Sequence, residues 1–145
     1  MVDRGGKLIQ PINLECGMRF PLSQKFMKHN ELGEWGEEFA TQYLTKKGYV
    51  ILDRNWVYER NEIDIVCQKE EGTLVVIEVK TRNSNFFGDP QEFVTPGKRK
   101  SIIKVADAYV VEKDLDVEVR FDIIAVLKNG KQESLEHFED AFYPF

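Results

Sequence analysis

Residues 62–81 read EIDIVCQKEEGTLVVIEVKT, and this stretch decides the fold. Two runs rich in Val and Ile, residues 62–68 and 74–81, flank a polar five-residue turn that contains Gly72. Runs of this kind, separated by a glycine turn, predict the two strands of a β-hairpin. The second run is almost continuously apolar, as is typical of a central strand that is buried on both faces.

A helix and a strand are predicted before this hairpin. The helix spans about Glu31 to Lys47, with Asn30 as its N-cap and Gly48 in the left-handed position that ends it. Its apolar stripe at helical spacing comprises Leu32, Trp35, Phe39, Ala40, Tyr43 and Leu44. Residues 49–58 then predict a strand that ends near Asn55.

A second helix and two strands are predicted after the hairpin. Residues 82–94 form a loop, and Thr95-Pro96 has the pattern of an N-cap followed by the first helical residue. The helix runs to about Lys113, residues 117–127 predict a fourth strand, and Asn129-Gly130 predicts a turn into a short fifth strand.

The resulting order, αβββαββ, indicates an α/β fold with a mixed central sheet flanked by helices. The first three strands should form an antiparallel meander. The helix between the third and fourth strands permits a right-handed parallel crossover.

The length of 145 residues suits one domain, residues 31–145, preceded by an extension of residues 1–30. Either Met27 is the native start and the stretch before it is a tail, or that stretch is an arm that orders on a partner. No apolar run is long enough to cross a membrane and no signal peptide is recognisable, so we expect a cytoplasmic protein. Cys16 and Cys67 form no metal-binding motif, and Cys67 is predicted to be a buried free thiol.

The formal net charge of −5 is unfavourable for binding nucleic acid, but the charges are unevenly distributed. Residues 80–104 carry a net charge of +4, whereas residues 112–145 carry −5. Besides Lys80, the basic side chains of the first segment are Arg82, Lys98, Arg99, Lys100 and Lys104. These side chains could bind phosphates near a helix N-terminus. A solvated, polar helix face is an equally good interpretation of them.

The predicted hairpin sets charged side chains inside apolar strands. If Gln68 pairs with Leu74, then Asp64 pairs with Glu78, and directly opposed residues have Cβ atoms about 4.5–5.5 Å apart. Two carboxylates at that separation repel each other unless a cation compensates them. Mg²⁺ is usually held by one or two carboxylates together with waters and substrate phosphate. Asp64 and Glu78 are therefore candidate ligands of a metal that serves phosphodiester hydrolysis.

Three further groups belong to this hypothesis. Lys80, on the same strand face as Glu78, could hold the attacking water or neutralise charge in the transition state. The Val79 carbonyl is a candidate backbone ligand, and Glu37, at the edge of the helical stripe, could reach a site between helix and sheet. The alternative is an ordinary surface ion pair between Asp64 and Lys80. The apolar strands favour the metal site, because burying uncompensated charge is costly.

Other polar residues receive different interpretations. Asp122, in Arg120-Phe121-Asp122, is expected to pair structurally with the arginine or to support the site from outside it. His29 and His137 are too isolated for a catalytic triad or a zinc site, and surface positions are expected for both. Pro96-Gly97-Lys98 lacks the spacing of a phosphate-binding P-loop.

Together these motifs resemble the YraN-like family, uncharacterised bacterial proteins regarded as endonucleases with a restriction-endonuclease-like fold. The resemblance runs from about Leu32 to the C-terminus and rests on several short motifs. These are Gly36-Glu37-Glu38-Phe39-Ala40, Gly48-Tyr49, Arg54-Asn55, Glu62-Ile63-Asp64-Ile65, Glu78-Val79-Lys80-Thr81-Arg82, Phe87-Gly88-Asp89-Pro90, Arg120-Phe121-Asp122 and Asp140-Ala141-Phe142. The family usually has glycine before its Glu-Ile-Asp motif. This chain has Asn61 there, and asparagine tolerates the left-handed backbone.

The resemblance implies that Asp64 and Glu78 ligate Mg²⁺ or Mn²⁺, that Lys80 assists the water and that Glu37 contributes to the metal shell. We expect a metal-dependent nuclease acting on nucleic acid, with DNA favoured over RNA. The alternative is a non-catalytic nucleic-acid-binding or protein-interaction module on the same fold. Expected partners are nucleic acid, a second copy in a homodimer, or a DNA-processing protein.

Overall fold

The computed structural model describes residues 29–83, 92 and 94–144. Its elements are helix α2 (His29–Lys46), strands β1 (Val50–Tyr58), β2 (Asn61–Gln68) and β3 (Thr73–Arg82), helix α4 (Pro96–Glu112), and strands β4 (Glu118–Asn129) and β5 (Gln132–Phe142). The predicted order αβββαββ is confirmed. The predicted extension up to residue 28, with Cys16, and the Phe87-Gly88-Asp89-Pro90 motif lie outside the described residues.

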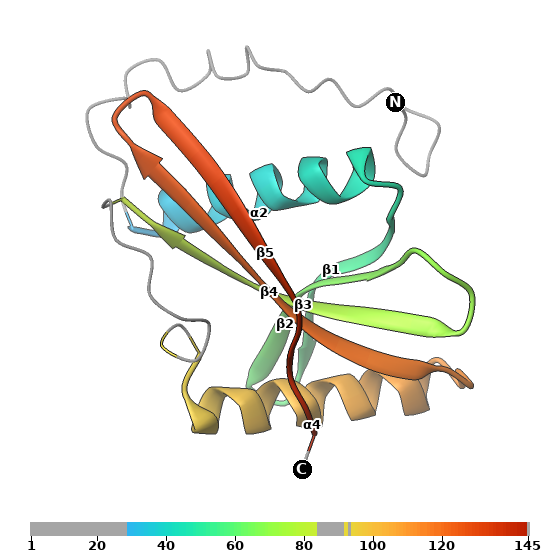
Figure 1. The fold of residues 1–145 in the computed structure, drawn as a ribbon. Helices are drawn as coiled ribbons and strands as arrows, with labels where there is room; N and C mark the ends of the chain where they lie inside the picture. Colours follow the sequence, from blue (N-terminus) through green and yellow to red (C-terminus); the bar gives the residue numbers. More distant parts are fainter. Residues whose placement is uncertain (1–28, 84–91, 93, 145) are drawn as a thin grey trace.

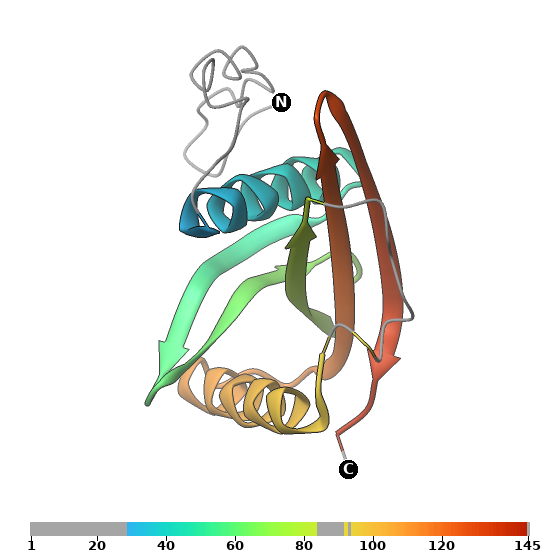
Figure 2. The ribbon, with the colours of Figure 1, turned by 90° about the vertical axis from the view of Figure 1, so that its left-hand side faces the viewer.

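The five strands form one sheet in the order β1-β2-β3-β4-β5. Strands β1, β2 and β3 pair antiparallel, β4 pairs parallel with β3, and β5 pairs antiparallel with β4. The predicted meander and parallel crossover are therefore confirmed. Figure 1 shows α2 on one side of the twisted sheet and α4 on the other, and Figure 2 shows the same layers after a quarter turn.

Each face of the sheet has its own apolar core. Alternate residues of β3 point to opposite faces, as the pleat of a strand requires. Val75 and Ile77 pack with the buried face of α2, which presents Ala40 and Leu44. Leu74 and Val76 pack on the other side, against the buried residues of α4, which are Ile102, Val105, Ala106 and Tyr109. The central position predicted for β3 is confirmed.

Local signals explain where the helices end. Gly48 has a φ of 97°, which confirms the left-handed position predicted for it, and Tyr49 N–H donates to the Leu44 carbonyl at 2.9 Å in a Schellman arrangement. At the start of α4, Thr95 Oγ1 accepts a hydrogen bond from Lys98 N–H at 3.2 Å, as predicted for an N-cap. The N-cap prediction for α2 was wrong, because the helix already includes Asn30.

Two edge strands are longer than predicted. Strand β1 continues past Asn55 to Tyr58, because Asn55 adopts a φ of 51° that asparagine tolerates and the pairing with β2 resumes at once. Strand β5 has eleven residues and is not short. It has only one neighbouring strand and is largely exposed, so it lacks the apolar alternation from which strands are predicted.

Two further sequence expectations can be compared with the structure. Cys67 is a buried free thiol, as predicted, and burial raises its pKa to about 12. Within the described ranges, neither helix has the length and apolar character needed to cross a lipid bilayer.

Candidate functional site

The approach of α2 to the sheet begins at Gly36. A Cβ atom at this position would overlap the side chain of Thr81 near the end of β3, so glycine lets the helix backbone lie directly against that side chain. Glu37 follows directly in the helix. It lies near enough to Asp64 to influence its ionisation. The Gly-Glu pair thus brings an acidic side chain of α2 towards the ends of β2 and β3.

Asp64 lies where the pairing of β2 with β3 ends. Gln68 is opposite Leu74, as predicted, but the ladder ends at the pair Ile65 and Ile77, one pair short of the predicted pairing of Asp64 with Glu78. Beyond that pair, Asp64 Oδ2 accepts a hydrogen bond from Val79 N–H at 2.8 Å. The Asp64 side chain therefore accepts the kind of hydrogen bond from the β3 backbone that the β2 backbone accepts elsewhere along the hairpin.

Asp64 and Glu78 are both buried, with exposed fractions of 8% and 4%. Burial, reinforced by the nearby Glu78 carboxylate, raises the pKa of Asp64 to about 8, although the Val79 N–H opposes the shift. Burial also raises the pKa of Glu78, against the lowering influence of Lys98 and Lys80. Burial therefore disfavours the charged form of both carboxyl groups, and the two lysines offset this only in part at Glu78.

Two lysines from different elements approach one oxygen of Glu78. Lys80 Nζ, from β3, lies 3.4 Å from Glu78 Oε2, and Lys98 Nζ, from the first turn of α4, lies 3.8 Å from the same atom. The other oxygen, Oε1, is buried and has no hydrogen-bond partner within the described part of the chain. Buried carboxylate oxygens are rarely left in this state, and an ion bound there would satisfy it.

The donor set suits a hard cation. Carboxylate and carbonyl oxygens are the ligands that Mg²⁺ and Mn²⁺ prefer. In an extended strand the N–H and C=O of one residue point towards the same neighbour, so the Val79 carbonyl shares the side on which Asp64 lies. Two carboxylates and this carbonyl could hold such an ion, leaving its other positions to water and phosphate.

Glu37 lies near these donors but forms its hydrogen bond with a different residue. Its Oε1 accepts a hydrogen bond from Asn55 Nδ2 at 3.0 Å. Residues 29–83, 92 and 94–144 contain no group of three or more His, Cys, Asp or Glu side chains arranged to hold a metal. The role of Glu37 as a direct ligand therefore stays a prediction, and the structure places it beside the Asp64–Glu78 pair.

The remaining basic residues of the predicted phosphate-binding set are dispersed. Lys100 and Arg82 are exposed, and Arg82 donates to the Thr81 carbonyl at 3.2 Å. Arg99 donates to the Val94 carbonyl and lies over the ring of Phe142. Lys104 forms an ion pair with Glu59 at 2.9 Å. Of this set, Lys98 is the residue that contacts a buried carboxylate.

A second polar cluster surrounds Asp122, which is fully buried. Arg120 donates to both of its oxygens, at 2.9 and 2.8 Å, which confirms the predicted arginine pair. His137 Nε2 lies 2.7 Å from Asp122 Oδ2, and its side chain is only 6% exposed. The surface position predicted for His137 was therefore wrong. Burial would raise the pKa of Asp122, but the hydrogen bonds from His137 and Arg120 outweigh it and hold that pKa below its usual range.

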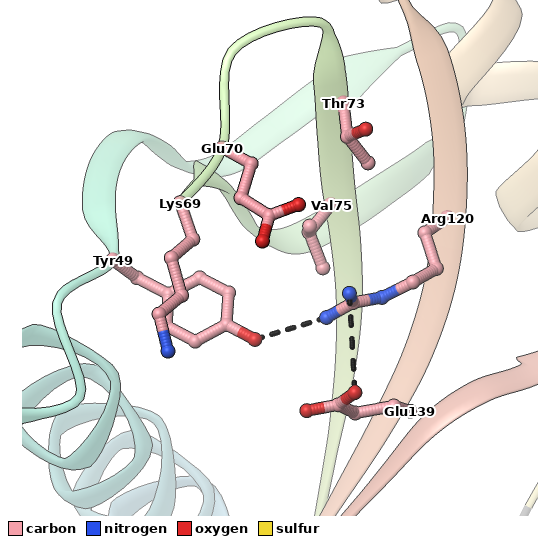
Figure 3. Close-up of a pocket in the computed structure, with 7 residues that line it drawn as sticks. All are labelled: Tyr49, Lys69, Glu70, Thr73, Val75, Arg120 and Glu139. Atoms are coloured by element: carbon pink, nitrogen blue, oxygen red, sulfur yellow. Dashed lines mark hydrogen bonds and ion pairs between the residues drawn. The ribbon is translucent and has the colours of Figure 1, made fainter.

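A small hollow of about 130 Å³ adjoins this second cluster (Figure 3). Its lining residues are Tyr49, Lys69, Glu70, Thr73, Val75, Arg120 and Glu139. Arg120 is already bound there by the Tyr49 hydroxyl at 2.9 Å and by Glu139 at 3.9 Å. Thr73 and Val75 belong to the beginning of β3, whereas Glu78 and Lys80 lie towards its end, so this hollow is separate from the carboxylate site.

Comparison with known proteins identifies the family. The family model described as "Uncharacterised protein family UPF0102" matches residues 36–126, which include Asp64, Glu78 and Asp122. The chain belongs to this family. A UPF0102 protein of Flavobacterium psychrophilum is 53% identical over 118 residues, which cover 81% of this chain and 98% of the relative. A UPF0102 protein of Bacteroides thetaiotaomicron is 45% identical over 117 residues, covering 81% and 96%. The YraN-like resemblance is confirmed at the level of this family.

Sequence reasoning assigned two residues of the carboxylate site incompletely. Lys98 was predicted to bind phosphate or to lie on a solvated helix face. Its contact with Glu78 was not predicted, because it arises only from the packing of α4 against the sheet. The Arg54-Asn55 motif was identified in the sequence, but no contact was predicted for Asn55. In the structure Asn55 has a left-handed backbone, and its amide donates to Glu37. An asparagine within a predicted strand is the signal that could have indicated this irregularity.

Proposed function

We propose that this UPF0102 protein is a metal-dependent nuclease that hydrolyses phosphodiester bonds in nucleic acid, with DNA favoured. The observation that carries the proposal is the buried pair of Asp64 and Glu78, in which Glu78 Oε1 has no partner within the described residues. A cation bound between them would remove the repulsion and satisfy that oxygen. The lysines beside them give the site the positive charge that a phosphodiester needs.

In this proposal each residue has a distinct part. Asp64, Glu78 and the Val79 carbonyl hold Mg²⁺ or Mn²⁺, and the Val79 N–H fixes the Asp64 carboxylate at 2.8 Å. A divalent ion held there would supply Lewis-acid chemistry for phosphodiester hydrolysis. Lys80 orients the attacking water and stabilises the charge that develops on the phosphate. Glu37, held by Asn55, completes the acidic side of the site.

A non-catalytic module on the same fold is the second candidate. The net charge of −5 favours it, because a nuclease must approach a polyanion. The small number of carboxylates at the site also favours it, since no third acidic side chain joins Asp64 and Glu78 among the described residues. In this case the protein would bind nucleic acid or a partner protein without cleaving a bond.

A cleavage assay separates the two candidates. Single-stranded, duplex and branched DNA are incubated with the full chain at about pH 8, with Mg²⁺, with Mn²⁺ or with EDTA. We expect cleavage that needs metal and falls more than about 100-fold in Asp64→Asn, since changes outside a metal's ligands already cost 10- to 100-fold. Glu70→Gln, at the far turn of the hairpin, is the matched control and should keep full activity. Cleavage that survives in Asp64→Asn would contradict the proposal.

A further inference from the structure

Lys98 occupies an unusual position for a surface lysine. Its backbone N–H donates to the N-cap Thr95, so the first turn of α4 holds its main chain in place. Its side chain is 40% exposed, yet its ammonium lies 3.8 Å from Glu78 Oε2, and Glu78 is almost completely buried. The Lys98 side chain is therefore partly exposed to solvent while its ammonium group contacts a buried carboxylate.

The two oxygens of Glu78 are compensated unequally. Lys80 and Lys98 both approach Oε2, at 3.4 and 3.8 Å, while Oε1 has no partner within the described residues. One lysine would suffice for an ordinary ion pair. The second ammonium therefore supplies extra positive charge beside the carboxylate that would hold a divalent ion.

A metal ion and two ammonium groups cannot share this carboxylate without strong repulsion. Mg²⁺ would sit about 2.0–2.1 Å from a Glu78 oxygen, and like charges only a few ångströms apart repel strongly in a buried site. Lys80 is on the same strand as Glu78, two residues away, and is the less exposed of the two lysines. Lys98 comes from a different element and is more exposed, so it is the group that can leave.

We propose that Lys98 is an exchangeable cation of this site, compensating Glu78 in the metal-free protein and moving to a substrate phosphate when the metal binds. This inference rests on the proposed nuclease function. The displaced ammonium would lie at the N-terminal end of α4, where the positive end of the helix dipole also favours a phosphate. Lys98 would thus couple metal binding to nucleic-acid binding.

The inference predicts two opposite effects of Lys98→Gln. Mn²⁺ should bind about two- to fivefold more tightly, measured by calorimetry without nucleic acid, because a competing ion pair of modest strength has been removed. Affinity for a single-stranded DNA oligonucleotide, measured with Ca²⁺ to suppress turnover, should fall. The slope of log affinity against log salt should become less steep by about 0.7, as for one lost phosphate contact on a single strand.

Two variants serve as controls. Lys100→Gln removes an exposed charge from the same helical turn and should leave Mn²⁺ affinity unchanged. Lys98→Arg keeps the charge and should restore wild-type Mn²⁺ binding. Thermal unfolding in EDTA verifies that each variant folds.

The outcomes separate the inference from the function on which it rests. If the wild-type protein binds Mn²⁺ and Lys98→Gln binds it equally or less tightly, the exchange is wrong while the nuclease proposal stands. If the wild-type protein binds no Mn²⁺, both proposals fail.

Discussion

At the scale of single residues, Asp64 and Glu78 are unfavourable for stability in the metal-free protein. Each is more than nine-tenths buried. Among the described residues, no third acidic side chain joins them to form a group that could hold a metal. Residues that lower stability are expected where function requires them. The same pair therefore predicts both where metal binds and how stability depends on pH.

The first prediction concerns that pH dependence. Because the pKa of Asp64 is raised from 3.8 to about 8, the folded state holds its proton more tightly than the unfolded state does. The resulting stabilisation is fully present below about pH 4 and is lost as the pH rises through about 8. In EDTA, the free energy of unfolding should therefore fall between these values in the wild type.

Asp64→Asn tests this sign directly, because the amide has a similar shape and does not titrate. Its free energy of unfolding, measured by chemical denaturation in EDTA, should decrease less with pH, because the part due to Asp64 is lost while the part due to the raised pKa of Glu78 remains. The variant should be the more stable protein at pH 8. Glu70→Gln, which changes an exposed acid, should follow the wild-type profile. Parallel profiles for the wild type and Asp64→Asn would show that Asp64 does not carry the shift.

At the scale of elements, the contact of α2 with β3 positions the acidic side of the site. Gly36 makes the close approach possible, and Asn55 of β1 then receives Glu37. A helix that packed farther from the sheet would carry Glu37 away from Asp64. Gly36 is therefore needed both for the packing of α2 on the sheet and for the position of Glu37.

Gly36→Ala should lower the free energy of unfolding by about 1–3 kcal/mol, the usual cost of forcing an extra methyl group into a packed contact. Gly33→Ala is the matched control in the same helix, because a Cβ there meets no atom within 4 Å. It should raise stability by about 0.5–1 kcal/mol, since alanine favours helix over glycine. Thr81→Ala should restore part of the loss in the double variant. Equal effects at Gly33 and Gly36 would contradict the close contact.

At the scale of the whole molecule, the sequence predicted the contacts that are close along the chain. The register of β2 and β3 follows from one five-residue turn and one apolar pattern, so the meeting of Asp64 with Glu78 could be expected. The cap at Thr95 and the ending at Gly48 are equally local. In each case the residues that determine the feature are close neighbours in the sequence.

The contacts that were missed join distant segments. The Tyr43 hydroxyl lies 3.1 Å from His137 Nδ1, although 94 positions separate them in the sequence. Only the sheet order, with β5 beside β4, brings His137 to Asp122 and buries it. Lys98 reaches Glu78 for a similar reason, since the two residues belong to the separate elements α4 and β3. No local pattern at either residue specifies these partners.

The most direct test of this account is to titrate Mn²⁺ into the full chain at about pH 8 by calorimetry, in the wild type, in Asp64→Asn and in Glu78→Gln. We predict one ion bound per chain in the wild type, and binding weakened at least about tenfold in each variant, because each loses a charged ligand. Wild-type affinity in both variants, or no binding in any protein, would contradict the claim that Asp64 and Glu78 form a metal site.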